Sequence, residues 1–61
     1  MTFKELDKVL QQNGWFQIRS RGSHFLYKHK DKSNTIAVPN HGGKDIKKGT
    51  LHSILKQAGL K

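Results

Sequence analysis

The sequence predicts an α+β fold in which two helices pack against one face of a three-stranded antiparallel sheet. Apolar residues recur at helical spacing near both ends of the chain. The stretch between them alternates apolar and polar residues and is divided by glycine, proline and short polar turns. The element order is therefore helix, strand, strand, strand, helix. At 61 residues, with no internal repeat or linker, residues 1–61 are expected to form a single small domain.

The first helix is predicted from its ends and from its apolar spacing. Thr2 and Glu5 form a capping-box pattern, so the helix is expected to begin at Phe3. Its apolar stripe comprises Phe3, Leu6, Val9 and Leu10. Asn13-Gly14 ends it, because both residue types tolerate the left-handed C-terminal conformation.

Three strands are predicted over residues 15–20, 24–29 and 35–38, separated by turns at 21–23 and 30–34. Pro39 ends the third strand because it has no N–H to donate. Alternation assigns Phe16, Ile18, Phe25, Tyr27, Ile36 and Val38 to the core face. The other face carries Gln17, Arg19, His24, Leu26, Lys28, Thr35 and Ala37. Two helices cannot cover both faces, so this second, polar and basic face is expected to stay open.

The last helix is predicted to start at an N-cap on Thr50 and to end at Gly59, with Leu60 folding back onto it. Its buried stripe comprises Leu51, Ile54, Leu55 and Ala58. Free backbone N–H groups at its N-terminus, beside Lys44, Lys47 and Lys48, predict a site that attracts phosphate.

Charge is the strongest signal in the composition. Twelve Lys and Arg against four Asp and Glu give a net charge of +8, which favours a polyanionic partner such as nucleic acid, an anionic membrane or an acidic protein. The alternative, that the lysines only keep the protein in solution, is less favoured because they cluster at 28–32 and 44–48. There is no cysteine and no apolar run longer than three residues, so we expect a cytoplasmic protein without a membrane span.

His24 is the best candidate for chemistry, since it follows a glycine turn and starts a strand on the face away from the core. Without cysteine a thiol nucleophile is impossible, and the serines lack a convincing histidine–acid partner. The chain has no phosphate-binding loop and no dinucleotide fingerprint. Asp45 is the only acid near the expected site. A metal site of His24, His29 and His41 stays open as an alternative, although no helical His-x-x-x-His spacing supports it.

Acid–base cleavage of RNA remains, and it requires neither a metal nor a cofactor when the 2′-hydroxyl is the nucleophile. His24 would take the proton from that hydroxyl, while cations steady the charge on the phosphate. The expected RNA-binding residues are Arg19, Arg21, Ser23, Lys28, His41, Lys44, Lys47 and Lys48. The plainer alternative is that His24 only hydrogen-bonds a neighbouring loop. His29 and His52 are expected to be exposed and without a role, and Trp15 is expected to pack.

Four ordered motifs resemble those of a known family. They are Asn13-Gly14-Trp15, Gly22-Ser23-His24 before an aromatic strand, Val38-Pro39-Asn40-His41, and Gly49-Thr50-Leu51 with the helix end at residues 54–60. Together they cover essentially the whole chain and are similar to the HicA toxins of HicA–HicB toxin–antitoxin systems. The resemblance implies a double-stranded-RNA-binding-domain-like fold, an mRNA-cleaving activity that halts translation, His24 as the catalytic residue, and neutralisation by a HicB antitoxin.

Two other functions are open. A non-catalytic double-stranded-RNA-binding module has the same element order, a histidine between its first strands and lysines at the start of its last helix. A basic adaptor whose only ligand is an acidic protein would share the charge but not the salt-dependent affinity for RNA.

Overall fold

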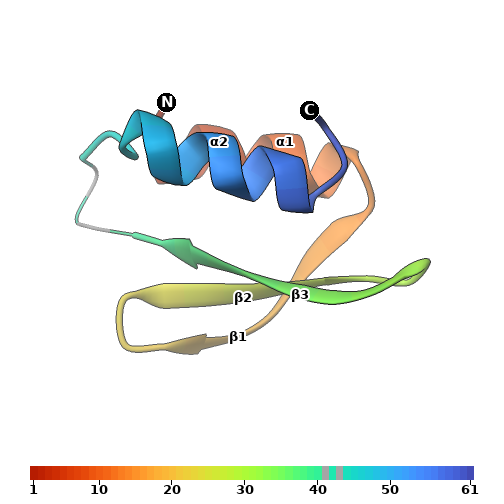
Figure 1. The fold of residues 1–61 in the computed structure, drawn as a ribbon. Coiled ribbons are helices and arrows are strands. Elements are labelled where there is room, and N and C mark those ends of the chain that lie inside the picture. The colour runs from red at the N-terminus through yellow and green to blue at the C-terminus, as the bar shows by residue number, and fades with distance from the viewer. Residues whose placement is uncertain (41, 43) are drawn as a thin grey trace.

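The chain folds into two helices and one antiparallel sheet. The computed structural model describes residues 1–40, 42 and 44–61. The elements are α1 (Phe3–Gln12), β1 (Trp15–Arg21), β2 (His24–His29), β3 (Lys32–Pro39) and α2 (Lys48–Gln57). The strands lie in the order β1-β2-β3, and both helices lie on one face of the sheet (Figure 1). The predicted α+β architecture with an open sheet face is therefore confirmed.

The hydrophobic core fills the layer between the helices and the sheet. Its buried members are Leu6, Leu10, Trp15, Tyr27, Ile36, Val38, Ile46, Ile54 and Ala58. Phe25 is partly buried and packs against this cluster, with its ring centroid 4.8 Å from that of Phe3. The core positions predicted on β2 and β3 are thus confirmed.

Local signals set both ends of α1 as predicted. The Thr2 hydroxyl accepts a hydrogen bond from the Glu5 N–H at 3.3 Å, and the Glu5 carboxylate accepts one from the Thr2 N–H at 2.9 Å. Asn13 is the C-cap, and Gly14 follows with a φ of 89°. A Cβ at Gly14 would lie 2.5 Å from the His29 Nε2, so this corner needs glycine for both its backbone angle and its space.

The direction of the β1 side chains differs from the prediction. Trp15 is 1% exposed, whereas Phe16 and Ile18 are 48% and 44% exposed. Phe16 pairs with Lys28, which is exposed, while Gln17 pairs with the buried Tyr27. The assignment of Phe16 and Ile18 to the core was therefore wrong. The indole of Trp15, the largest side chain in the chain, enters the core directly after the Gly14 turn. Ordinary alternation then directs the Phe16 side chain to the other face of the sheet, opposite to the prediction.

A β-bulge at Ile18 then reverses the side-chain alternation of β1. The register shifts between Gln17 and Arg19, and beyond the shift Arg19 pairs with Leu26 and Arg21 with His24. Because the bulge adds one residue, Ile18 and Arg19 both project away from the helices. We call this side of the sheet the open face. It carries Phe16, Ile18, Arg19, Arg21, His24, Leu26, Lys28 and Ala37.

The turn between β2 and β3 is shorter than predicted, because β3 already begins at Lys32. The backbone N–H of Asp31 donates to His29 Nδ1 at 3.0 Å, which leaves the ring proton on Nε2. That Nε2–H donates to the Asn13 carbonyl at 3.0 Å, and the ring meets Trp15 edge-on at 5.3 Å between centroids. His29 is half-buried and links the hairpin to the end of α1, so the expectation that it is exposed and without a role was wrong.

The last helix begins earlier than predicted and ends as predicted. Lys47 is its N-cap, and Thr50 lies inside the first turn, so the N-cap prediction was wrong. The half-turn before the helix is fixed by Ile46, which is 9% exposed and donates its N–H to the Met1 carbonyl at 2.9 Å. At the other end, Leu60 N–H donates to Leu55 O at 2.8 Å, the bond of a Schellman motif. Within the described residues, neither helix has the length and apolar character needed to cross a membrane.

Candidate nucleic-acid-cleaving site

His24 stands at the first position of β2, immediately after the two-residue loop Gly22-Ser23. Gly22 has a φ of 59°, and a glycine of positive φ at the first loop position suits a type II′ hairpin turn. The next residue, Phe25, packs towards the core, so His24 points to the open face and is exposed. Arg21 on β1 and Pro39 on β3 are its partners across the sheet.

A cavity of about 740 Å³ opens beside His24. Three separate parts of the chain form its wall: the end of the sheet, the segment that follows β3, and the first turn of α2. The lining residues are His24, Ala37, Pro39, Lys44, Asp45, Ile46, Lys47 and Thr50. The histidine therefore shares one cavity with two lysines that lie 20 or more positions away in the sequence.

Backbone hydrogen bonds hold the cavity wall in place. The Asn40 N–H donates to the Ser23 carbonyl at 2.8 Å, which joins the end of β3 to the turn that precedes His24. Thr2 and Asp45 form an isolated antiparallel bridge, and Ile46 is tied to Met1 as described above. Lys44 and Lys47 thus flank a stretch of chain that is anchored to the N-terminus of the protein.

The electrostatics of this cavity suit an anion. Two ammonium groups belong to its wall, and α2 starts there with an N-cap, Lys47, whose side chain makes no capping hydrogen bond. The first N–H groups of a helix have no partner inside the helix and carry a partial positive charge. The lining residues supply two lysines, one histidine and a single carboxylate, that of Asp45, beside the start of α2, so the cations outnumber the acid where a phosphate would enter.

The cavity brings together some of the sequence-predicted site residues. His24, Lys44 and Lys47 line it, Arg21 lies opposite His24 in the strand register, and Ser23 is in the preceding turn. Arg19 and Lys28 are farther along the open face, and Lys48 is the first residue of α2 but is outside the described lining. His41 lies outside the described residues.

Sequence reasoning placed Asp45 near the site, and its position in the cavity wall confirms this. Thr50 also lines the cavity, which the sequence does not predict, because a threonine at this place is equally typical of a helix N-cap. Thr50 lies in the first turn of α2. The start of that helix depends on the burial of Ile46, which is a contact between distant parts of the chain. The exposed side chains of Phe16 and Ile18 were missed because their direction follows from the burial of the Trp15 indole, a tertiary contact that nothing local in the sequence marks.

The two described histidines of the alternative metal site do not converge, and the third, His41, lies outside the described residues. His24 and His29 are at opposite ends of β2 and, five positions apart, project to opposite faces of the sheet. Within residues 1–40, 42 and 44–61, no three groups of the His, Asp and Glu type converge around one point.

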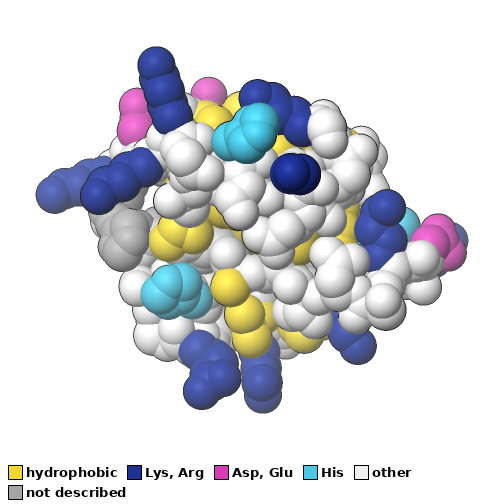
Figure 2. Space-filling view, in the orientation of Figure 1, with side chains coloured by type: hydrophobic (Ala, Val, Ile, Leu, Met, Phe, Trp, Pro, Cys, Tyr) yellow, Lys and Arg dark blue, Asp and Glu magenta, His cyan; other side chains and the backbone are white. Residues whose placement is uncertain are grey.

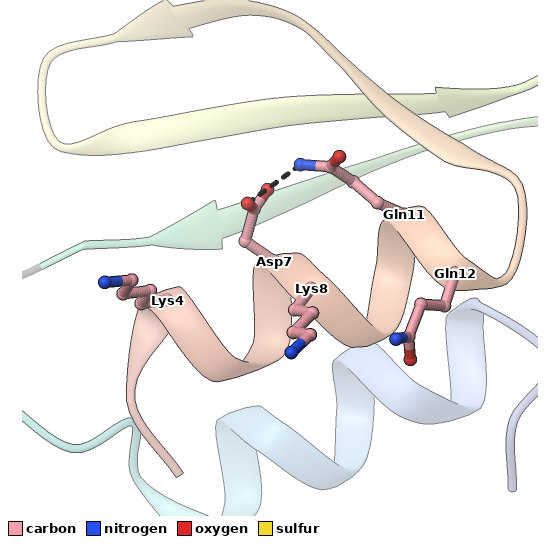
Figure 3. A pocket seen from close by; sticks show the side chains of 5 residues that line it. All are labelled: Lys4, Asp7, Lys8, Gln11 and Gln12. Atoms are coloured by element: carbon pink, nitrogen blue, oxygen red, sulfur yellow. Dashed lines mark hydrogen bonds between the residues drawn. The ribbon is translucent and has the colours of Figure 1, made fainter.

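A second hollow, of about 490 Å³, lies on α1 and is lined by Lys4, Asp7, Lys8, Gln11 and Gln12 (Figure 3). Its carboxylate has structural partners: Asp7 accepts hydrogen bonds from Gln11 Nε2 at 2.9 Å and from the Tyr27 hydroxyl. Burial raises the pKa of the Tyr27 phenol, and the bond to Asp7 and the charge of that carboxylate raise it further. This hollow contains no histidine among its described lining residues, so it offers no group comparable to His24.

Comparison with known proteins places the chain in a family. Residues 3–60 match the family model of the HicA toxin of bacterial toxin–antitoxin systems. A protein of Pseudomonas fluorescens (strain Pf0-1), described as a probable mRNA interferase HicA, is 36% identical over 61 residues, which span 100% of this chain and 98% of that protein. The chain therefore belongs to the HicA toxin family of bacterial toxin–antitoxin systems.

Proposed function

We propose that this protein is the toxin of a type II toxin–antitoxin pair and acts as an mRNA-cleaving endoribonuclease with His24 as its general base. The observation that carries the proposal is the shared cavity of His24, Lys44 and Lys47 at the start of α2. The description of the Pseudomonas relative as an mRNA interferase supports the same substrate and reaction.

In the proposed reaction, a ring nitrogen of His24 takes the proton of a ribose 2′-hydroxyl. The 2′-oxygen then bonds to the adjacent phosphorus, and the bond from phosphorus to the 5′-oxygen of the next nucleotide breaks. The products are a 2′,3′-cyclic phosphate and a 5′-hydroxyl whose proton comes from solvent. Lys44 and Lys47 stabilise the negative charge that grows on the phosphate, and this stabilisation is large in a site with preorganised cations. The nucleophile is part of the substrate, so the step requires no metal-bound water.

The test replaces the base and measures cleavage and binding separately. With EDTA present, His24→Ala is expected to slow RNA cleavage by about 10²–10⁴-fold, because that is the typical contribution of a positioned general base. Affinity for RNA is expected to persist, since the cations remain. His52→Ala is the matched control, because His52 is an exposed histidine on α2 whose Nδ1 lies 3.3 Å from the Lys61 ammonium and not in the cavity wall.

Cleavage at the wild-type rate by the His24→Ala protein would overturn the role of His24. Binding of intact RNA by the wild-type protein without any shortened product would instead favour the non-catalytic RNA-binding module.

We also propose that a HicB-type antitoxin neutralises the protein by covering the cavity at His24. Membership of a toxin–antitoxin family supports such a partner, and the net charge of +8 suits one with an acidic surface. In the same cleavage assay, the purified product of a neighbouring antitoxin reading frame is expected to keep RNA intact in stoichiometric amounts. A tight complex that still cleaves RNA would place the partner elsewhere on the toxin.

A further inference from the structure

The open face exposes large apolar side chains to solvent. Phe16 and Ile18 are 48% and 44% exposed, and they are two of the three large hydrophobic side chains that the described structure exposes. Leu26 is half-buried beside them. Figure 2 shows hydrophobic side chains at the surface on the side of the molecule opposite the helices, with Lys and Arg side chains next to them. Grouped exposed apolar side chains mark a binding surface.

The strand register arranges this face in rows that begin at His24. Arg21, His24 and Pro39 form the first row, Arg19, Leu26 and Ala37 the second, and Phe16 pairs with Lys28 in the third. Four residue steps along β2, from His24 to Lys28, separate the first row from the third, a distance of about 13 Å at about 3.3 Å per residue. Aromatic, aliphatic and cationic side chains therefore alternate along one continuous surface that leads away from His24.

No carboxylate side chain interrupts this surface. The protein has four: Glu5 and Asp7 are on α1, Asp31 is in the turn after β2, and Asp45 is in the cavity wall. The open face has Arg19, Arg21 and Lys28 instead. A ligand that matches it must combine regularly spaced negative charge with flat apolar groups.

We propose that the open face binds an unpaired RNA strand, with a base stacked on Phe16 and phosphates on Arg19 and Lys28, and delivers it to the cavity at His24. Sheets that bind single-stranded RNA stack about two or three bases on exposed aromatic rings in this way. A duplex would not fit, because its bases are stacked on one another and its phosphates follow the shape of a double helix. The inference rests on the proposed nuclease function and narrows its substrate class to single-stranded RNA.

The experiment measures binding without cleavage. Fluorescence anisotropy in the His24→Ala background compares one labelled single strand with its annealed duplex. Phe16→Ala is expected to weaken binding of the single strand by about tenfold, the fold-change that stacking of one base corresponds to. Phe16→Tyr keeps an aromatic ring and is expected to retain affinity, whereas Phe16→Leu keeps an apolar side chain of similar size and is expected to lose it. The control is Lys8→Gln, an exposed lysine on α1.

Three outcomes would overturn the inference. The first is equal affinity for the single strand and the duplex. The second is a Phe16→Ala protein that binds the single strand as tightly as its parent. The third is a Phe16→Ala protein that loses affinity for an antitoxin protein but not for RNA, which would assign the face to a protein partner. Circular dichroism of each variant identifies any that fails to fold. If Phe16→Ala does, Phe16→Leu keeps the test decisive, because it removes the aromatic ring and retains an apolar side chain. Each of these outcomes is independent of whether wild-type protein cleaves RNA, so failure of the inference is distinguishable from failure of the nuclease proposal.

Discussion

Gly14 and His29 form the corner where α1 turns into the sheet. The imidazole lies against Gly14 and joins the Asn13 carbonyl, the Asp31 N–H and the edge of Trp15. One ring thus connects the end of a helix, the start of one strand and the turn after another. This contact requires a residue without a Cβ at position 14, because a Cβ there would lie 2.5 Å from the ring nitrogen.

Gly14→Ala is expected to destabilise the protein. The left-handed backbone alone costs about 1–2 kcal/mol for a residue with a Cβ, and displacement of His29 adds the loss of its hydrogen bonds. Urea unfolding followed by Trp15 fluorescence measures the change. Gly49→Ala is the matched control: Gly49 lies in the first turn of α2 with open space around it, so alanine there is expected to stabilise by up to about 1 kcal/mol. A Gly14→Ala protein as stable as wild type would contradict the close contact.

At the scale of secondary-structure elements, Tyr27 and Asp7 link β2 to α1. Tyr27 is 0% exposed, and its hydroxyl donates to the Asp7 carboxylate on the adjacent helix. Burial, followed by the effects of Asp7, raises the pKa of the phenol above its ordinary value. The folded protein therefore keeps the Tyr27 proton at a pH where the unfolded chain releases it.

Tyr27→Phe is expected to lower the free energy of unfolding at pH 7 by about 1.5–3 kcal/mol, the value of a hydrogen bond to a charged group. Above pH about 10 the unfolded phenol ionises, so the folded state binds more protons than the unfolded state and wild-type stability falls as pH rises. Tyr27 is the only tyrosine, so the variant lacks this decline, and its stability difference from wild type is expected to shrink between pH 9 and 11. Urea unfolding at several pH values checks it. A constant difference would mean that the hydroxyl is not bonded in the folded state.

How far each element could be predicted depends on how local its determinants are. The capping box at Thr2, the glycine at the end of α2 and the turn before His24 each lie within a few residues, and sequence reasoning found all three. The side-chain direction of β1 depends on where the Trp15 indole packs and on a bulge opposite β2, and both are contacts between distant positions. The candidate site shows the same division. Residue type alone marks His24, Lys44 and Lys47 as candidates, whereas nothing local marks the ring of Phe16 as exposed.

At the scale of the whole molecule, the hydrophobic core and the basic residues of the sheet lie on opposite faces of that sheet. The sheet turns one face to the helices and core, and its other face carries Arg19, Arg21 and Lys28 next to the cavity that contains Lys44 and Lys47. Cations gathered in this way attract RNA regardless of its base sequence. Their contribution to affinity falls as the salt concentration rises, because salt cations compete with them for the phosphates.

The salt dependence of RNA binding is expected to reveal which lysines contact phosphate. For a single strand, each lost phosphate contact reduces the slope of log affinity against log salt by about 0.7. Lys28→Gln, in the His24→Ala background, is expected to reduce the slope by that amount, and Lys8→Gln on α1 is expected to leave it unchanged. Titrations at four or five salt concentrations measure it. An unchanged slope for Lys28→Gln would remove Lys28 from the RNA-binding surface.

The extra residue in β1 has one more consequence. Before the bulge, even-numbered side chains leave the sheet on the solvent side, and after it odd-numbered ones do, so Phe16 and Arg21 emerge in the same direction. Had the strand kept strict parity, either the arginines or the phenyl ring would have been directed at the interior. A one-residue insertion or deletion between Phe16 and Arg21 would thus place the phenyl ring and the guanidinium on opposite faces of the sheet, although both residues would still be present.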